Sequence, residues 1–462
     1  MNSSYFKRIQ SVIGYGLMLT VSCCLSLQAQ NATTPLSKPP VSKKTEKVVS
    51  RAKYKEQLYG FWLGECIANW TGLVTEMDKI GNIGSIKTGA FYTRDNWGKP
   101  DQPNIFEGGG LTGNFSPTID FIFKNEGEIW GADDDTDIEY IYQHLLLTNQ
   151  TSMLTGKQIR DGWLKHMKHE EENFLWVSNQ KALDLMKGGM LPPATSEPKN
   201  NPEYEMIDAQ LTTELFGLLA PTRPDIALKM AQLPIQTTAR ENAQWIAEFY
   251  VIMHALASYT DDTQPIKQRI YWMADQARKH LPKHSYSAKM YDFVKAQHRA
   301  GIPWEQVRDQ LYQRYQVEQA DGYTMTSRNL YCNACFAAGI NFAASLISLW
   351  YGEGDIKETI KIGTLAGWDA DNPTATWGGL LGFMLGKEGV EKAFNRKFAD
   401  KFNIHRTRVG FPNDGLDTFD DMANRGLLVV DRVIQEQMGG TVNLKKGTWS
   451  IPQKPLNIPL GR

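Results

Sequence analysis

The sequence predicts an all-α fold in a single large domain, and three observations lead to this prediction. Apolar residues recur at three- and four-residue steps in several stretches, as they do on one face of a helix. Strand signals are few. No second linker divides residues 51–462, so we expect them to form one multi-helix domain.

Residues 1–30 resemble a signal peptide. Lys7 and Arg8 precede an uncharged stretch at 11–27, and small and polar residues follow at 29–31. This stretch is short and diluted by Ser and Gly for a spanning helix. We therefore expect cleavage and an exported protein, periplasmic or secreted, with a membrane anchor as the alternative.

Residues 31–50 are polar, contain Pro and hold few large apolar side chains, which predicts a linker before a domain that begins near Arg51. Cys23 and Cys24 follow an imperfect lipoprotein signal, so a lipid anchor is a further alternative. No later apolar run is long enough to cross a bilayer, and we expect no integral membrane span once the signal is removed.

Apolar stripes predict the helices of the domain in order. The stretches with helical spacing are 59–67, 137–147, 243–259 and 336–350. A further helix at 375–385 carries several Gly residues, which allow the close approach of another helix. Residues 81–130 are rich in Gly, Asn and aromatic residues without a clear period, and they predict an irregular insertion with a short hairpin.

The composition and charge exclude one class of partner. Hydrophobic residues make up 42% and charged residues 22% of the chain, which is ordinary for a globular protein with a large core. The formal net charge is -1 and the sequence shows no basic face, so we expect no nucleic-acid partner.

The cysteines are sparse. Outside the predicted signal peptide the chain keeps Cys66, Cys332 and Cys335, and this odd set does not predict a disulfide framework. Cys332 and Cys335 form a CxxC without the further ligands of a zinc site. We expect both to be small packing residues on a helix, with stability provided by the core.

Asp133, Asp134 and Asp135 are three adjacent carboxylates that precede the predicted helix at 137–147. Their mutual repulsion costs free energy unless a cation or several donors neutralise them. Oxygen ligands in a tight group suit Mg²⁺, Ca²⁺ or Mn²⁺. A helix N-cap explains one Asp but not three, and a solvated acidic loop is the alternative to a metal site.

Asp369, Asp371 and Asn372 form a second cluster, again before a helix with small residues. The two Asp residues alternate, so both can point toward one centre, and Asn372 adds a neutral oxygen. A polar turn with Pro373 in the first helical turn is the alternative, whereas the Gly and Glu of an EF-hand loop are absent. Because both clusters precede helices, we expect one composite site near two helix N-termini, whose positive dipole ends suit anionic ligands.

A third element runs from Gly60 to Glu76. Gly60 and Gly64 recur at four-residue spacing along a predicted helix, which indicates close helix packing. Glu76 follows Gly72 in a predicted loop, where an acid can reach a site. The alternative for Glu76 is an ordinary surface position.

These segments resemble the ADP-ribosylglycohydrolase family, which includes the dinitrogenase reductase-activating glycohydrolase. That family reads roughly GxxxGxxxGDxxGxxxE near its start, TDDT further along and GGDTDT late. The resembling segments here are Gly60 to Glu76, Asp133 to Thr136 and Gly367 to Asn372, in the same order. The resemblance implies an all-helical fold and a site for two magnesium ions.

The resemblance implies a set of metal ligands. These are Asp133, Asp134, Asp135, Asp369, Asp371 and Asn372. Asp133 and Asn372 stand where the family has ligating threonines, so both keep an oxygen ligand, and Asp133 adds negative charge. We expect the cations to be Mg²⁺, with Mn²⁺ as the alternative.

The resemblance also implies residues near the substrate. Glu76 matches the early glutamate, and with Asp134 and Asp135 it is the expected catalytic group that accepts a proton. Asn69 replaces the aspartate of the early GD pair and is expected beside the substrate. Trp368 replaces a glycine next to the late cluster, where it can stack on a ring, with core packing as the alternative.

We therefore expect an exported hydrolase that cleaves an N- or O-glycosidic bond with metal-activated water. The expected substrate is a small ADP-ribosyl-like compound, a glycoside or a glycan, and export favours a glycan because ADP-ribosylated proteins are chiefly intracellular. One alternative is a catalytically degenerate protein that binds a sugar or nucleotide sugar on this fold. A calcium-stabilised structural domain is another. The sequence predicts no particular oligomeric state.

Overall fold

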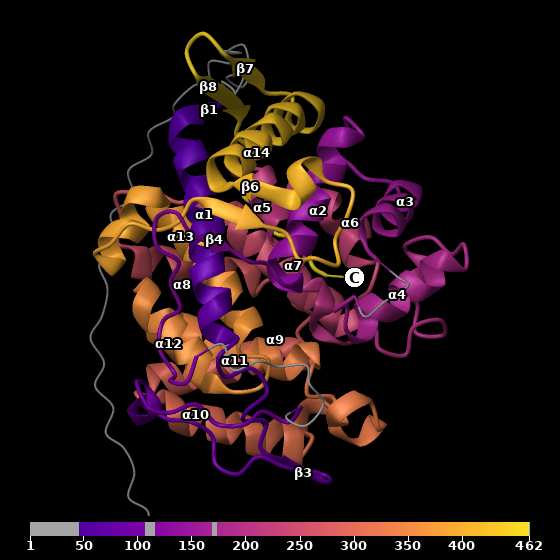
Figure 1. Cartoon of the computed structure of the whole chain (residues 1–462), viewed down its shortest axis with the longest axis vertical. Coiled ribbons are helices and arrows are strands. Elements are labelled where there is room, and N and C mark those ends of the chain that lie inside the picture. The colour runs from indigo at the N-terminus through magenta and orange to yellow at the C-terminus, as the bar shows by residue number, and fades with distance from the viewer. Residues whose placement is uncertain (1–45, 107–115, 169–172, 462) are drawn as a thin grey trace, which may run out of the picture. The chain divides into compact units, whose positions relative to one another are not determined.

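The structure is a computed structural model that describes residues 46–106, 116–168 and 173–461 (Figure 1). All described elements belong to one compact unit, Lys44–Arg462. Helices dominate it, which confirms the predicted all-α class. The predicted signal peptide at 1–30, Cys23, Cys24 and residues 31–45 of the predicted linker lie outside the described residues.

Each helix predicted from an apolar stripe is present. The α-helices of the described residues are α1 Arg51–Gly72, α2 Asp134–Thr148, α3 Gly156–His166, α4 Val177–Lys187, α5 Leu215–Leu219, α6 Pro224–Ile235, α7 Glu241–Ala257, α8 Ile266–Ala277, α9 Tyr286–Arg299, α10 Trp304–Leu311, α11 Ala338–Gly352, α12 Ile356–Ala366, α13 Asp371–Phe394 and α14 Phe419–Val433. Caps fix some of their ends: the Ser50 hydroxyl accepts from the backbone N–H of Lys53 at 3.3 Å and starts α1.

The strands are short and form three small sheets. Their bounds are β1 Glu46–Ser50, β2 Asn82–Ile83, β3 Ile86–Lys87, β4 Ile129–Trp130, β5 Lys401–Asn403, β6 Leu416–Thr418, β7 Thr441–Asn443 and β8 Thr448–Pro452. The strand orders are β1-β8-β7, β2-β3 and β4-β5-β6, with β4 and β5 parallel and the other pairs antiparallel. The β2–β3 hairpin confirms the one predicted in the irregular insertion at 81–130.

Strand β1 corrects the predicted end of the linker. Residues 46–50 were expected to belong to it, but they pair with β8, Val49 opposite Trp449. The partner strand lies about 400 positions away in the sequence. No local signal in residues 31–50 reveals this pairing, because the hydrogen bonds that order β1 come from the far end of the chain.

A seam of glycines joins α1 to α13. A Cβ on Gly64 would lie 3.0 Å from the Cα of Gly382, and one on Gly72 would lie 2.8 Å from the backbone N of Asp371. The two helices therefore touch backbone to backbone, and the close packing predicted from the glycine spacing is confirmed. The end of α1 is thereby brought against the start of α13, where Asp371 lies.

Helices α7 and α11 are buried along nearly their whole length. Trp377 of α13 donates its indole N–H to the carbonyl of Ser345 in α11 at 2.8 Å, and Tyr250 of α7 bonds the Ser345 hydroxyl at 2.6 Å. These contacts tie α13 to the centre of the core. In the described residues, no helix is both long and apolar enough to cross a membrane.

Cys332 and Cys335 form a disulfide, which corrects their predicted role as packing residues on a helix. They lie instead in a tight turn before α11, where Cys332, Asn333 and Ala334 have φ of 43°, 56° and 62°. Left-handed backbone is costly for residues other than glycine, and the disulfide spans the segment that adopts it. Cys66 is a free thiol buried in the core.

Candidate functional site

Both predicted acidic clusters lie at helix N-termini. Asp133 is the N-cap of α2, and its Oδ1 accepts from the backbone N–H of Asp135 at 3.2 Å. Asp371 is the first residue of α13, after a turn in which Gly367 and Trp368 have φ of 98° and 59°. A Cβ at Gly367 would lie 2.5 Å from the carbonyl oxygen of Lys79, so this turn requires glycine.

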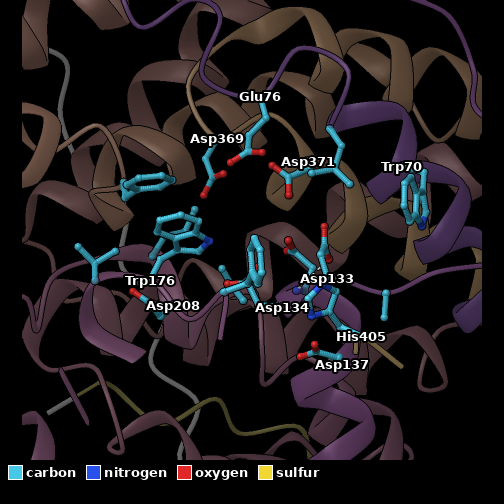
Figure 2. Close-up of a pocket in the computed structure, with 18 of the residues that line it drawn as sticks. Trp70, Glu76, Asp133, Asp134, Asp137, Trp176, Asp208, Asp369, Asp371 and His405 are labelled. Atoms are coloured by element: carbon cyan, nitrogen blue, oxygen red, sulfur yellow. Dashed lines mark hydrogen bonds between the residues drawn. The ribbon is translucent and has the colours of Figure 1, made fainter. Parts of the chain in front are cut away.

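Six carboxylates from three parts of the chain meet in one cavity (Figure 2). One group holds Glu76, Asp369 and Asp371, and the other holds Asp133, Asp134 and Asp135. Within each group, one carboxylate oxygen from every residue lies within 4.8 Å of the others. Glu76, from the loop after α1, and both predicted clusters are thus brought together as expected.

The two groups raise one another's pKa values. Burial raises the pKa of Glu76 well above its usual range, and the charges of Asp371, Asp133 and Asp134 add to this effect. Burial and then Asp371 raise the pKa of Asp133 to about 8. Burial and the same neighbour raise the pKa of Asp135. Carboxylates held this closely require a positive charge among them to remain ionised together.

The donor set fits divalent cations that prefer oxygen ligands. Asp133 Oδ2 and Asp371 Oδ1 are buried and have no hydrogen-bond partner, as expected of atoms that await a ligand. Among the described residues that line the cavity, Arg408 is the only Arg or Lys. Its side chain is fully buried and pairs with Asp137 at 2.9 Å, so it does not neutralise either group.

Asn69 and Asn372 lie behind the cavity wall and hold Asp135. The Asn372 amide donates to Asp135 Oδ1 at 2.9 Å, and the Asn69 amide donates to Asp135 Oδ2 at 3.4 Å. The Asn372 oxygen accepts from Gln210 at 3.0 Å. Both side chains are fully buried, and their hydrogen bonds orient a carboxylate. The metal ligation predicted for Asn372 and the substrate contact predicted for Asn69 stay predictions.

Trp368 is placed in the core, away from the predicted position beside the substrate. Its side chain is fully buried, and its indole N–H donates to Gln316 at 2.9 Å. Its ring packs against Phe91 with centroids 4.8 Å apart. The left-handed turn at Trp368 directs the ring inward, and this supports the packing alternative.

The remainder of the cavity wall is largely aromatic and aliphatic. The cavity has a volume of about 210 Å³, and its rings include Trp70, Phe106, Phe174, Trp176 and Phe336. In Figure 2, Trp176 and Trp70 lie on opposite sides of the acidic groups. Trp70 lies within the segment Gly60–Glu76, whereas the other rings lie outside every motif and carried no sequence signal.

Two further titratable residues of the wall were not predicted. Asp208 accepts from the Ser178 hydroxyl at 2.6 Å and from the backbone N–H of Asn179 at 3.0 Å, and burial raises its pKa to about 6. Burial lowers the pKa of His405 to about 4, with help from Arg408. Both are single polar residues in unremarkable sequence, so only the fold reveals them.

A second layer of carboxyl groups lies deeper than the cavity. Its members are fully buried: Glu65, Glu139 and Glu214. Glu65 precedes Asn69 by four positions, Glu139 follows Asp135 by four, and Glu214 follows Gln210 by four. Glu65 hydrogen-bonds to Glu139, and Glu139 accepts from the backbone N–H of Leu215 at 2.6 Å.

Glu214 in this layer accepts from the Thr376 hydroxyl at 2.8 Å. Within the part of the chain that the structure describes, only the two cavity groups bring three acidic oxygens within 4.8 Å. The deeper layer is therefore held by hydrogen bonds rather than arranged around a cation.

One comparison with known proteins covers this site. The family model for ADP-ribosylglycohydrolase matches residues 50–427, which include all six carboxylates. No protein of curated function matches the chain significantly in sequence.

Among solved structures, the chain resembles an "ADP-ribosylglycohydrolase-related protein complex" at 14% identity and a TM-score of 0.40, over 82% of this chain and 99% of that one. The family match spans most of the chain and covers both acidic clusters. The chain therefore belongs to the ADP-ribosylglycohydrolase family.

Proposed function

We propose that this protein is a metal-dependent hydrolase that cleaves an N- or O-glycosidic bond. The observation that carries the proposal is the arrangement of two groups of three carboxylates across one cavity, at the N-termini of α2 and α13. Membership of the family suggests glycohydrolase activity. The dependence on metal rests on the crowding of buried like charges.

Two divalent cations fit the proposal, most simply Mg²⁺, with Mn²⁺ as the alternative. Glu76, Asp369 and Asp371 would hold one, and the carboxylates at 133–135 would hold the other. Such cations supply positive charge that stabilises developing negative charge and lowers the pKa of water. Both helix dipoles place their positive ends at the same carboxylates.

The side chains of the site divide the remaining work. Asn69 and Asn372 fix the orientation of Asp135 through its two oxygens. Among the described residues, the carboxylates of Glu76 and Asp134 accept no hydrogen bond from protein, and both residues are partly exposed to the cavity. We assign to these two the acceptance of a proton from the water that attacks the anomeric carbon.

An exported location is part of the proposal. The supporting observation from the sequence is the signal-like pattern at 1–30. The Cys332–Cys335 disulfide also supports an oxidising compartment.

The test incubates the purified protein with a panel of aryl glycosides, oligosaccharides and ADP-ribosyl compounds and measures their hydrolysis. Each compound is assayed with Mg²⁺, with Mn²⁺ and with EDTA. We expect turnover that EDTA abolishes and that Asp369→Ala also abolishes. Tight, metal-dependent sugar binding without turnover would replace the hydrolase with a binding protein. Turnover that persists in EDTA would overturn the metal requirement.

A further inference from the structure

The disulfide between Cys332 and Cys335 closes a turn next to the cavity. Cys332, Asn333 and Ala334 have φ of 43°, 56° and 62°, and backbone of this hand is unfavourable for residues with a Cβ. Three such residues in succession persist only where the surrounding structure holds them. Reduction of the disulfide would therefore remove a covalent bond from a segment whose backbone is unfavourable without support.

The turn reaches the acidic groups through one side chain. Asn341, in the first turn of α11, is fully buried. Its amide N–H groups donate to the carbonyls of Cys335 and Ala337, both at 3.0 Å. Its oxygen accepts from the backbone N–H of Asp369 at 3.1 Å. Asn341 therefore joins the disulfide turn directly to one of the six carboxylate residues of the cavity.

The segment that carries Asp369 is anchored on two sides. On one side, Trp368 bonds to the loop after α1: its carbonyl accepts from the backbone N–H of Met77, and its own N–H donates to the carbonyl of Lys79, both at 2.8 Å. On the other side lies the bond from Asp369 to Asn341. Loss of the Asn341 bond would leave a buried N–H without a partner. The position of the Asp369 carboxylate in its group thus depends on Asn341.

The same turn also fixes part of the cavity wall. The Phe336 carbonyl accepts from the backbone N–H of Ile207 at 2.9 Å, and Ala338 donates to the carbonyl of Glu205 at 3.0 Å. Phe336 and Ile207 both line the cavity. A change in the turn can therefore act on the wall or on the carboxylates, and the affinity for a cation alone reports the second route.

The disulfide is open to reduction from one side. Cys332 is partly exposed, whereas Cys335 is fully buried. A thiolate of a dithiol can attack the sulfur of Cys332, which breaks the S–S bond and releases Cys335 as a thiolate that takes up a proton. The second thiol of the dithiol then displaces Cys332 as a thiol. The dithiol is oxidised to its own disulfide, and the protein gains two thiols.

We propose that the Cys332–Cys335 disulfide is a redox control on the cation site, and that Asn341 is the positioning residue that transmits it. With the disulfide closed, Asn341 holds Asp369 in place and the site binds a divalent cation tightly. With the disulfide reduced, the turn relaxes, Asn341 loses its fixed partner and the cation is bound more weakly. The inference rests on the proposed metal-dependent function and adds its regulation.

The experiment measures the Kd of the full chain for Mg²⁺ by calorimetry, with the disulfide intact and after reduction by dithiothreitol. Thiol titration checks the redox state, and thermal unfolding in EDTA checks that each form is folded. One variant is Asn341→Leu, which keeps the side-chain volume but makes no hydrogen bond. The other is the double variant Cys332→Ser, Cys335→Ser, which cannot form the disulfide. Ser348→Ala is the matched control, since Ser348 is a buried polar residue of α11 whose hydroxyl donates to the carbonyl of Ser345 at 2.9 Å.

We expect reduction to raise the Kd of the natural chain for Mg²⁺ about tenfold, the scale of effect when an outer partner of a metal ligand is lost. The double serine variant should bind as weakly as the reduced chain, and dithiothreitol should not change it further. Asn341→Leu should raise the Kd about tenfold in the oxidised state and should make it insensitive to reduction, because the transmitting bond is absent. Ser348→Ala should keep the full response to reduction.

Equal Kd values for the oxidised and the reduced natural chain would overturn the inference. An undiminished effect of reduction in Asn341→Leu would also overturn it, as would unfolding of the natural chain on reduction. These outcomes differ from failure of the proposed function. A chain that binds Mg²⁺ with a redox-dependent Kd but hydrolyses no glycoside keeps the redox control and loses the hydrolase, whereas a chain that binds no Mg²⁺ in either state overturns the cation site and the control together.

Discussion

The cavity layer and the deeper layer hold the same kind of side chain in different surroundings. In the cavity, six carboxylates lie in two tight groups with unpartnered oxygens, and no described basic residue balances them. Deeper in the core, Glu65 hydrogen-bonds to Glu139, Glu139 accepts from a backbone N–H and Glu214 accepts from a hydroxyl. One oxygen of each of these three is also without a partner, but the three do not converge on one point. Burial raises the pKa of Glu65 and Glu139 well above their usual range, which favours the protonated form of both.

The difference shows that acid content alone does not make a cation site. A cation site requires oxygens that converge and are free of other partners, together with access from solvent. The deeper groups lack both access and convergence, so protons rather than cations remove their charge. The predictions below separate the two layers by asking which variants change the response to cations and which change only stability.

Asp371→Ala should have the largest effect. We expect kcat/KM to fall at least about 100-fold, since the variant removes a carboxylate of the group proposed to hold a cation, and the charge of that cation would stabilise the reacting centre. Mg²⁺ at about 100 times its Kd should add about 3 kcal/mol to the stability of the natural chain, and this gain should vanish in the variant. Thermal unfolding with Mg²⁺ and with EDTA measures it. Asp262→Ala, an exposed aspartate paired with Lys53, is the control and should keep the full response.

Glu214→Gln should change how stability depends on pH. Burial raises the pKa of Glu214 to about 7, against 4.5 for the ordinary group. Between pH 4.5 and about 7 the folded chain keeps the proton of Glu214, whereas the unfolded chain loses it. The contribution of Glu214 to the free energy of unfolding is therefore fully present below pH 4.5 and is lost as the pH rises through about 7. Glutamine does not titrate. The free energy of unfolding of the variant, relative to that of the natural chain, should therefore rise by about 3 kcal/mol from pH 5 to pH 8.

Denaturant unfolding in EDTA at the two pH values measures the Glu214 effect. The cation response of this variant should be unchanged. A difference between variant and natural chain that is the same at both pH values would show that Glu214 does not titrate in this range.

Glu139→Ala should cost about 1–3 kcal/mol, because it leaves the buried backbone N–H of Leu215 without an acceptor. Glu139→Gln keeps an acceptor oxygen and should cost less. Both variants should retain the Mg²⁺-dependent rise in melting temperature. Loss of that rise without a loss of stability would mean that the deeper layer takes part in cation binding.

Asp133→Thr should have the smallest effect. Threonine can replace the aspartate as the N-cap of α2, so stability in EDTA should change by less than about 1 kcal/mol. The hydroxyl keeps an oxygen in the group and removes one repelling charge. Retention of the Mg²⁺ response in a thermal scan would show that the extra carboxylate is dispensable, and its loss would assign Asp133 an essential charge.

The two layers also show what could be predicted from this sequence. Runs of acids at 133–135 and 369–371 are visible locally, and each precedes an apolar stripe, so both the helices and the composite site follow from spacing. Glu65, Glu139 and Glu214 belong to no run of adjacent acids. They meet only because α1, α2 and the segment before α5 pack together, and no local pattern records that packing.

The aromatic wall was missed for the same reason. Trp176 and Phe336 lie far from the motifs in sequence, and their roles depend on how their loops fold over the cavity. Trp368 was adjacent to a motif but has its side chain directed inward by a left-handed turn. Proximity along the chain was therefore a good guide to the carboxylates, whose helices point them inward, and a poor guide to the wall.

The glycine seam between α1 and α13 determines how this protein could diverge. Because main-chain atoms touch along the seam, the distance between Glu76 and Asp371 depends on contacts that no side chain adjusts. Trp176 and Phe336 of the wall lie outside this seam, at the start of α4 and just before α11. Descendants of this chain could thus acquire new specificities by exchanging Trp176 or Phe336, while the spacing of the carboxylates would pass unchanged from one specificity to the next.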